Sequence, residues 1–236
     1  MSEMPPTDSA SIPPPSPPPP PREAGLPWEE PNAGLGAIFP TAVSFVTRPI
    51  ESFSRMSLTV DLVRPIAYFV ACALIAACIS QLWGYVLYDS FVGVIRSLAG
   101  TQFDKIAPFV KKPGLLQLAA TLVLTPLVSL IVLFVWSALV HLMLTLLGGA
   151  NRGFAATLRV MCYAQTTQLA VVVPGVGGLI AVVWRLILEI VGLSQAHKTD
   201  GWKALLAVLL PLLLCCGCIV FAIVAFGAAV GQAFQK

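Results

Sequence analysis

Long apolar stretches with few charges fill most of the chain from residue 62 to residue 234. Hydrophobic residues make up 57% of the 236 residues, and charged residues make up only 11%. Soluble domains contain about 45–50% apolar and about 25% charged residues, so this composition does not fit a chain that folds in water. Because a helix needs roughly 20 apolar residues to cross a bilayer, the stretches predict an all-α, polytopic membrane helix bundle.

Short connections divide the apolar stretches into about five transmembrane helices. GGANRG at 148–153 and PGVGG at 174–178 are typical turn sequences, because glycine and proline interrupt regular structure. An odd number of spans places the two termini on opposite sides of the membrane. More lysines and arginines fall on the N-terminal side, which favours a cytoplasmic N-terminus. The expected spans are 65–88, 120–147, 155–173, 177–193 and 203–233.

The first 37 residues differ from the rest and predict a disordered, Pro-rich cytoplasmic tail. PPPSPPPPP at 13–21 cannot form helical or sheet hydrogen bonds, because proline lacks the N–H donor. It is typical of a polyproline II spacer. A solvated tail is favoured, and a docking site for an SH3-like or WW-like domain is the alternative.

Residues 38–60 predict an amphipathic segment in front of the membrane domain, which covers 61–236. Apolar side chains recur at helical spacing, with polar residues and arginines around them. This pattern fits either a helix lying in the membrane interface or a helix packed on the end of the bundle. Pro49 predicts a break near Arg48. The apolar positions are Phe39, Val43, Val46, Ile50, Phe53 and Met56.

An arginine and a glutamate interrupt the apolar run AVVWRLILEIVGL at 181–193. Arg185 and Glu189 are four residues apart, so they share one helix face and can pair. A charge in the bilayer costs at least about 2.5–3.5 kcal/mol on insertion scales, so this face should point into the bundle. Candidate polar neighbours on other spans are Gln165, Gln168, Ser137, His141 and Thr145.

The cluster of Arg185, Glu189, Gln165, Gln168 and His141 allows two interpretations. It could form an ion or proton pathway or a polar cavity for a lipid headgroup, as intramembrane charges often do. It could equally be a satisfied polar contact that fixes helix order. A pathway requires a continuous polar line across the bilayer, and the sequence shows a single cluster, which favours a membrane scaffold over a transporter.

Small residues predict helix packing at two places. Gly178 and Gly192 flank the charged pair on its own face, and Gly227 and Gly231 form a GxxxG pattern in the last span. Small residues let helix backbones approach closely. Because a GxxxG pattern can also join helices of two chains, a homo-oligomer is an alternative.

Motifs of known catalytic chemistry are missing from the sequence. It contains no P-loop, no HExxH, no GxSxG and no glycine-rich dinucleotide motif, so we expect neither an enzyme nor a cofactor. The six cysteines lie in apolar stretches without zinc-ligand spacing, so no metal site is expected. A net charge of +3 and the lack of a basic tract give no reason to expect nucleic acid as a partner.

Three stretches resemble the Yip1 family of five-span membrane proteins. DLVRP at 61–65 is similar to the family's Asp-Leu-x-Gly-Pro motif, with Asp61, Leu62 and Pro65 matching and Arg64 in place of glycine. CYAQTTQLAVVVP at 162–174 resembles a Gly-Tyr motif that ends in proline, through Tyr163 and Pro174. GLSQAHKTDGWKALLAVLLP at 192–211 resembles the connection into the last span of bacterial members.

The resemblance implies a multispan scaffold with a cytoplasmic N-terminus. Eukaryotic members are implicated in vesicle trafficking and Rab GTPase interaction. The composition, rich in Ala, Leu, Val and Pro and poor in lysine, points to a bacterial chain in the cytoplasmic membrane, where Rab binding is not expected. The first hypothesis is therefore a non-catalytic membrane scaffold that contacts lipid and unknown protein partners. The alternative is a small transporter or channel that uses the intramembrane polar cluster.

Overall fold

Four long helices form the framework of the molecule, in a computed structural model that describes residues 25–58, 61–110, 112 and 114–233. All regular elements in these residues are helical, and the four helices are long and apolar enough to cross a membrane. The predicted all-α membrane bundle is thereby confirmed. The helices are α3 (Val63–Val86), α6 (Leu115–Leu146), α8 (Gly177–His197) and α9 (Gly201–Ala233).

The predicted third span, 155–173, is a helix in two parts. It consists of α7 (Gly153–Ala164) and the 3-10 helix η5 (Gln165–Val172). All residues from Ala156 to Thr167 are buried, so this part of the segment lies inside the bundle, whereas Val172 at its end is exposed. A segment facing lipid must satisfy its backbone by regular helical bonds, whereas a buried one can change to the tighter 3-10 geometry because neighbouring helices surround it.

The α7–η5 segment runs alongside α3 and in the same direction. Near the start of α3, the Arg159 guanidinium donates to the backbone carbonyl of Asp61. Near the end of α3, the Trp83 indole N–H donates to the carbonyl of Val172 over 3.2 Å. The α7–η5 segment therefore lies where a membrane-spanning helix was expected. Neither α7 nor η5 is long enough to span a bilayer by itself.

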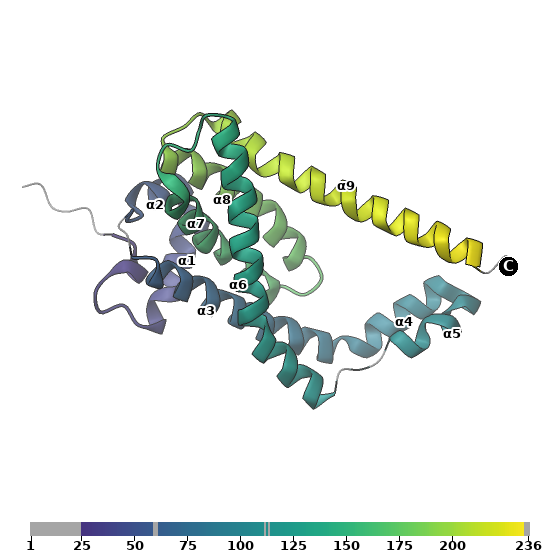
Figure 1. Ribbon diagram of the computed structural model, residues 1–236. Helices are drawn as coiled ribbons and strands as arrows, with labels where there is room; N and C mark the ends of the chain where they lie inside the picture. The colour runs from purple at the N-terminus through teal and green to yellow at the C-terminus, as the bar shows by residue number, and fades with distance from the viewer. Residues whose placement is uncertain (1–24, 59–60, 111, 113, 234–236) are drawn as a thin grey trace, which may run out of the picture.

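Helices α6 and α9 have wide apolar surfaces. In the most apolar window of α6 only 6% of the residues are buried, and in that of α9 only 17%. Figure 1 shows α9 running away from the bundle toward the C-terminus, and the short helices α4 (Tyr88–Ala99) and α5 (Phe103–Ile106) projecting beyond the far end of α3. Apolar surface on this scale fits contact with the lipid bilayer.

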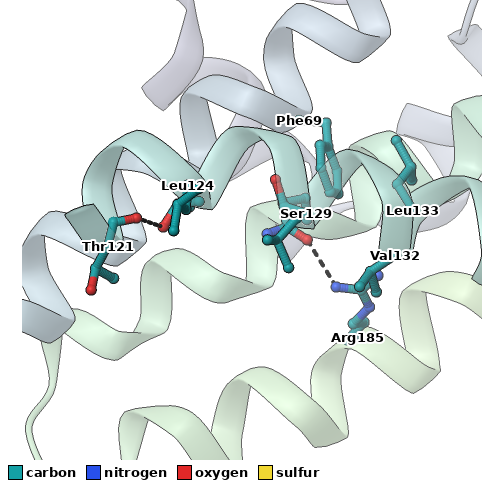
Figure 2. A pocket seen from close by; sticks show the side chains of 10 residues that line it. Phe69, Thr121, Leu124, Ser129, Val132, Leu133 and Arg185 are labelled. Carbon is teal, nitrogen blue, oxygen red and sulfur yellow. Dashed lines mark hydrogen bonds between the residues drawn. The ribbon is translucent and has the colours of Figure 1, made fainter.

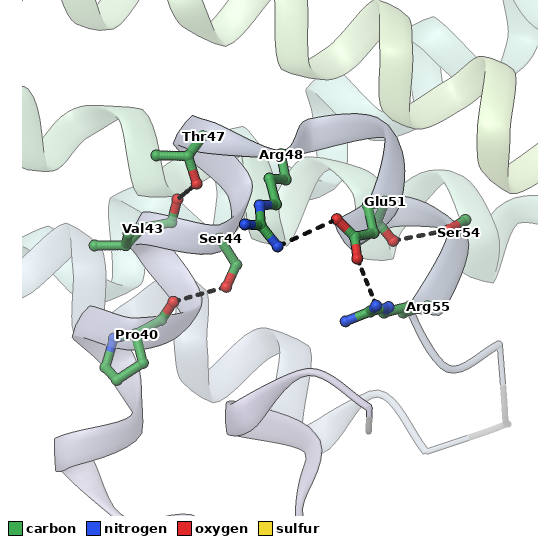
Figure 3. A network of polar contacts seen from close by, with 8 residues as sticks. All are labelled: Pro40, Val43, Ser44, Thr47, Arg48, Glu51, Ser54 and Arg55. Atoms are coloured by element: carbon green, nitrogen blue, oxygen red, sulfur yellow. Dashed lines mark hydrogen bonds and ion pairs between the residues drawn. The ribbon is translucent and has the colours of Figure 1, made fainter. Parts of the chain in front are cut away.

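The segment before the membrane helices folds as two short helices, α1 (Ile38–Thr47) and α2 (Pro49–Arg55). The predicted break is confirmed, because Arg48 between them is not helical. Figure 3 shows this corner, where the Glu51 carboxylate lies between the guanidinium groups of Arg48 and Arg55. Two further 3-10 turns, η1 (Pro27–Glu29) and η2 (Leu35–Ala37), precede α1.

The predicted apolar stripe of this segment is divided between two environments. Phe53 and Met56 are buried, whereas the four positions from Phe39 to Ile50 are exposed. Helix α1 packs on the bundle with another face, made of Ile38, Thr41, Ala42 and Phe45. The exposed apolar positions Phe39, Val43 and Val46 of α1, continued by Ile50 at the start of α2, are called the α1 stripe below.

Gly192 allows α2, α7 and α8 to meet closely. A Cβ atom added there would lie 2.6 Å from Val160 Cγ1 and 2.8 Å from the Phe53 ring. At Gly178, near the other end of α8, an added Cβ would meet no atom within 4 Å. Gly227 and Gly231 lie outside the residues whose side-chain surroundings the structure describes.

Gly192→Ala is expected to destabilise the protein by about 1–3 kcal/mol, the usual range for overpacking a core position. Thermal unfolding in detergent measures this effect. Gly178→Ala is the matched control on the same helix, and it should leave the melting temperature unchanged or raise it slightly, because alanine favours helix more than glycine does. Equal melting temperatures of the two variants would contradict the close packing at Gly192.

Candidate functional site

Glu29 joins three separate segments at one end of the bundle. Its Oε1 atom accepts a hydrogen bond of 2.8 Å from the Tyr163 hydroxyl on α7. Its Oε2 atom accepts a bond of 2.9 Å from the backbone N–H of Ser57, in the loop after α2. The carboxylate therefore fixes the start of the described chain to both the pre-membrane helices and the buried α7.

Trp28 and Arg64 form a reciprocal contact beside Glu29. The Trp28 indole N–H donates to the Arg64 carbonyl over 2.7 Å, and the Trp28 backbone N–H donates to Thr41 Oγ1 over 3.0 Å. The Arg64 guanidinium donates in return to the carbonyls of Trp28, Glu30 and Pro31. Arg64 stands where the family motif has glycine, and here it holds the segment 26–31 against the first turn of α3.

Aromatic rings fill the space beneath these polar contacts. Tyr163 stacks on Phe45 with ring centroids 4.9 Å apart, and it also packs against Tyr68 at 5.2 Å. Trp28 meets Tyr68 edge-on at 5.7 Å. Aromatic pairs of this kind contribute about 0.5–1.5 kcal/mol each beyond their burial. Residues from η1, α1, α3 and α7 thus share one core.

Arg159 is a buried cation on α7, with 2% of its surface exposed. Its guanidinium donates to the carbonyl of Ser57 over 2.7 Å and to the carbonyl of Asp61. The Asp61 carboxylate accepts from the backbone N–H of Val63 over 2.9 Å, at the start of α3. Arg159 therefore holds the loop that leads into the first long helix. The sequence pattern did not single out this arginine, which lies within the third expected span.

Arg64→Ala is expected to release the segment 26–31 from the bundle end. The variant loses three hydrogen bonds from a charged donor, and bonds of this type contribute about 1.5–3 kcal/mol where they are buried and less where they are exposed. Limited proteolysis should cut the segment several times faster than in the parent chain. Arg48→Ala is the control, because the one contact that the Arg48 side chain makes with described residues is an exposed ion pair of 3.8 Å with Glu51. Equal cleavage of both variants would contradict the role of Arg64.

The structure brings three of the predicted polar residues together in the middle of the bundle. Arg185 Nε donates to Glu189 Oε1 over 2.8 Å, and Arg185 Nη1 donates to Gln165 Oε1 over 2.8 Å. Glu189 Oε2 also accepts from the Trp136 indole over 3.2 Å, a partner that the sequence did not suggest. The Glu189 side chain is only 1% exposed, and that of Arg185 is 23% exposed. The Gln168 side chain makes no hydrogen bond within the described part of the chain.

His141 belongs to a different cluster, at the end of the bundle where α6, α7 and α8 meet. Its Nδ1 lies 2.8 Å from Thr157 Oγ1, which lies 2.9 Å from His197 Nε2. The Arg152 backbone N–H donates to His197 Nδ1 over 3.2 Å. Because Nδ1 of His197 accepts, its Nε2 donates to Thr157, and the threonine hydroxyl then donates to His141. The chain of bonds is satisfied with both imidazoles neutral.

A metal centre does not emerge from these clusters. Among the residues that the structure describes, no three His, Cys, Asp or Glu side chains are placed to hold an ion. Cys72 and Cys162 are buried, whereas Cys78 and the cysteines of the 215–218 stretch are exposed on membrane helices as free thiols. The polar clusters are therefore built from hydrogen bonds and one ion pair.

The residues that resemble family motifs lie at the points where α3 and α7 are anchored. Asp61, Leu62 and Pro65 form the entry to α3, Tyr163 contacts Glu29, and Pro174 lies in the turn between η5 and α8. The Yip1 domain family matches residues 43–223, well over half of the chain. The chain belongs to the Yip1 family. The matched range of the Yip1 domain runs from α1 into α9, and Trp28 and Glu29 precede it. No curated protein and no solved structure gives a significant match.

Proposed function

We propose that this Yip1 family protein is a non-catalytic membrane scaffold, with its N-terminus in the cytoplasm, that takes part in membrane organisation or trafficking. In this proposal the chain resides in a bacterial cytoplasmic membrane. It contacts lipid through α6 and α9, and it presents its N-terminal region to protein partners. The family membership, the apolar surface and the excess of basic residues on the N-terminal side support this assignment.

One observation carries the proposal: the segment in front of the membrane helices is docked on the bundle. Glu29 is bonded to Tyr163 and to Ser57, and Arg64 holds the carbonyls of Trp28 to Pro31. This docking fixes the position of residues 28–31 on the membrane domain. It also holds the α1 stripe outward, where an exposed apolar surface can contact a partner protein. An adaptor requires a surface beside the membrane that is held in one position, and the docked segment supplies such a surface.

The geometry gives less support to the transporter or channel alternative. The cluster of Arg185, Glu189 and Gln165 and the cluster of His141, Thr157 and His197 are separate. No hydrogen bond between described residues connects them. Within each cluster the groups bond to one another: Arg185 pairs with Glu189, and Thr157 bridges the two histidines. A continuous polar pathway across the bilayer is therefore not favoured.

Photo-crosslinking in native membranes tests the scaffold role. A photoreactive amino acid at Phe39, on the α1 stripe, is compared between the full chain and a variant lacking residues 1–24. This deletion leaves Trp28, Glu29 and the core residues of α1 and α2 in place. The proposal expects discrete protein adducts in the full chain, and a smaller set after the deletion, while the variant stays in the membrane.

A photoreactive amino acid at Val183 provides the control, because this residue is exposed on α8, in the membrane part of the chain. It should give lipid adducts only. If the Phe39 position also gives only lipid adducts, and if the deletion changes neither partners nor localisation, the scaffold proposal is wrong.

A further inference from the structure

A cavity of about 480 Å³ lies beside Arg185, between α3, α6, η5 and α8. Figure 2 shows the Arg185 side chain reaching from α8 toward the wall formed by α6, near Ser129 and Val132. The wall residues Leu124, Val128 and Val132 are more than half exposed. Because α6 has a lipid-facing composition, the cavity opens toward the bilayer, and its occupant must come from there.

The guanidinium of Arg185 has more donors than the protein uses. Arginine carries five N–H groups. The described residues accept two of them, through Glu189 Oε1 and Gln165 Oε1. The remaining three, which include both N–H groups of Nη2, have no acceptor in the described part of the chain. Unsatisfied donors are costly in a medium of low dielectric constant, so the cavity favours an occupant that brings acceptor oxygens.

The hydroxyl groups on the α6 wall do not supply these acceptors. Thr121, Thr125 and Ser129 each donate to a backbone carbonyl of their own helix, and none of them is bonded to Arg185. Between them lie apolar side chains such as Leu124 and Val128. The cavity thus combines a cationic inner end with a largely apolar wall that carries a few hydroxyl oxygens.

We propose that this cavity binds a membrane amphiphile through an anionic oxygen group, a carboxylate or a phosphate, held by the free N–H groups of Arg185. The planar guanidinium matches two oxygens of such a group. The hydrocarbon chain of the ligand lies along α6 between Leu124 and Val132. Glu189 keeps the arginine in position from its other side, where the Trp136 indole also holds the carboxylate. This binding site does not depend on the scaffold role.

Native mass spectrometry of the full-length protein in neutral detergent tests the site with three probes. Oleate carries a carboxylate, dioleoyl phosphatidylglycerol carries a phosphate, and diolein has the same chains without an anion. We expect one molecule of an anionic probe per chain, bound at least about tenfold more tightly than diolein, because hydrogen bonds to charged groups contribute at least that factor. Binding of oleate alone identifies a carboxylate site, and binding of phosphatidylglycerol alone identifies a phosphate site.

Two tryptophan variants of α6 separate this site from general lipid adhesion. Val128→Trp fills the cavity and should reduce binding of the anionic probe to the level of diolein. Leu127→Trp is the matched control, because Leu127 is the adjacent residue, is similarly exposed and does not line the cavity. It should bind as the parent does. Equal binding of the three probes to the parent chain, or full binding by Val128→Trp, would overturn the proposal and leave water as the occupant.

The double variant Arg185→Gln with Glu189→Gln removes the charge and keeps the cavity. It should lose the preference for an anion and bind all three probes alike. If the double variant is folded and still prefers oleate or phosphatidylglycerol by tenfold or more, Arg185 is not the recognition group and the proposal is wrong.

Discussion

Arg185→Met is expected to lower the free energy of unfolding by about 3–5 kcal/mol, the range for removing one partner of a buried ion pair. The variant leaves the Glu189 carboxylate, which is only 1% exposed, without its cation. The Trp136 indole would be its only remaining partner among those the structure shows. Glu189→Gln should cost less, because Arg185 is 23% exposed and keeps its bond to Gln165.

The double variant Arg185→Met with Glu189→Gln is expected to recover much of this loss, because it buries no unpaired charge. Thermal unfolding of the parent, the two single variants and the double variant in one detergent measures the coupling between the residues. If all three variants are as stable as the parent, the pair contributes nothing to stability. The interpretation of the pair as a structural contact would then be contradicted.

Arg159→Met is expected to destabilise the protein by about 3 kcal/mol or more, since hydrogen bonds to a charged donor are worth about 1.5–3 kcal/mol each. The buried guanidinium donates to the carbonyls of Ser57 and Asp61, and methionine would leave both of them without this donor. The loop into α3 should then loosen. Chemical denaturation in mixed micelles, followed by circular dichroism of the helices, measures the loss of stability.

Arg159→Lys provides the comparison for this prediction. Lysine keeps the positive charge, but its single ammonium cannot reproduce the planar arrangement of guanidinium donors. We therefore expect a loss of stability between those of the parent and Arg159→Met. A lysine variant as stable as the parent would show that charge alone holds the loop, and that the two directed bonds are not needed.

The long helices and the contact of Arg185 with Glu189 and Gln165 followed from the sequence. A helix that crosses a bilayer needs about 20 apolar residues in a row. The apolar runs of this chain are that long, so the sequence predicted α3, α6, α8 and α9. The pairing of Arg185 with Glu189 follows from the spacing of four residues on a helix. Gln165 was expected because buried polar side chains on neighbouring spans need partners.

Other features depend on tertiary contacts that local patterns do not show. The segment 155–173 carries more polar side chains than the lipid-facing helix α6, and its division into α7 and η5 accompanies the burial of Ala156 to Thr167 among neighbouring helices. His141 was grouped with Arg185, but it contacts Thr157 and lies near His197 instead. The spacing of residues along a helix shows which side chains share one face. It does not show which side chains of other helices that face contacts.

The docking of the segment around Trp28 and Glu29 on the bundle was not predicted from the sequence, because this segment follows a proline-rich stretch. Trp28 and Glu29 follow a proline-rich stretch and were counted with the tail of residues 1–37. The available signal was an apolar and aromatic group, Leu26 and Trp28, beside acidic residues in an otherwise polar stretch. Such a group suggests a docking segment, but its partners Arg64 and Tyr163 lie far along the chain and cannot be paired with it from spacing alone.

Amide hydrogen exchange of the full-length chain in lipid nanodiscs tests most directly whether residues 26–58 are a folded part of this membrane scaffold. The Trp28 amide donates to Thr41, and the Ser57 amide donates to Glu29. Peptides that contain these amides should therefore exchange slowly, and Arg64→Ala should speed up exchange around Trp28 more than around Ser57. If both peptides in the parent chain exchange as fast as an unstructured peptide, the segment is not docked and the account is contradicted.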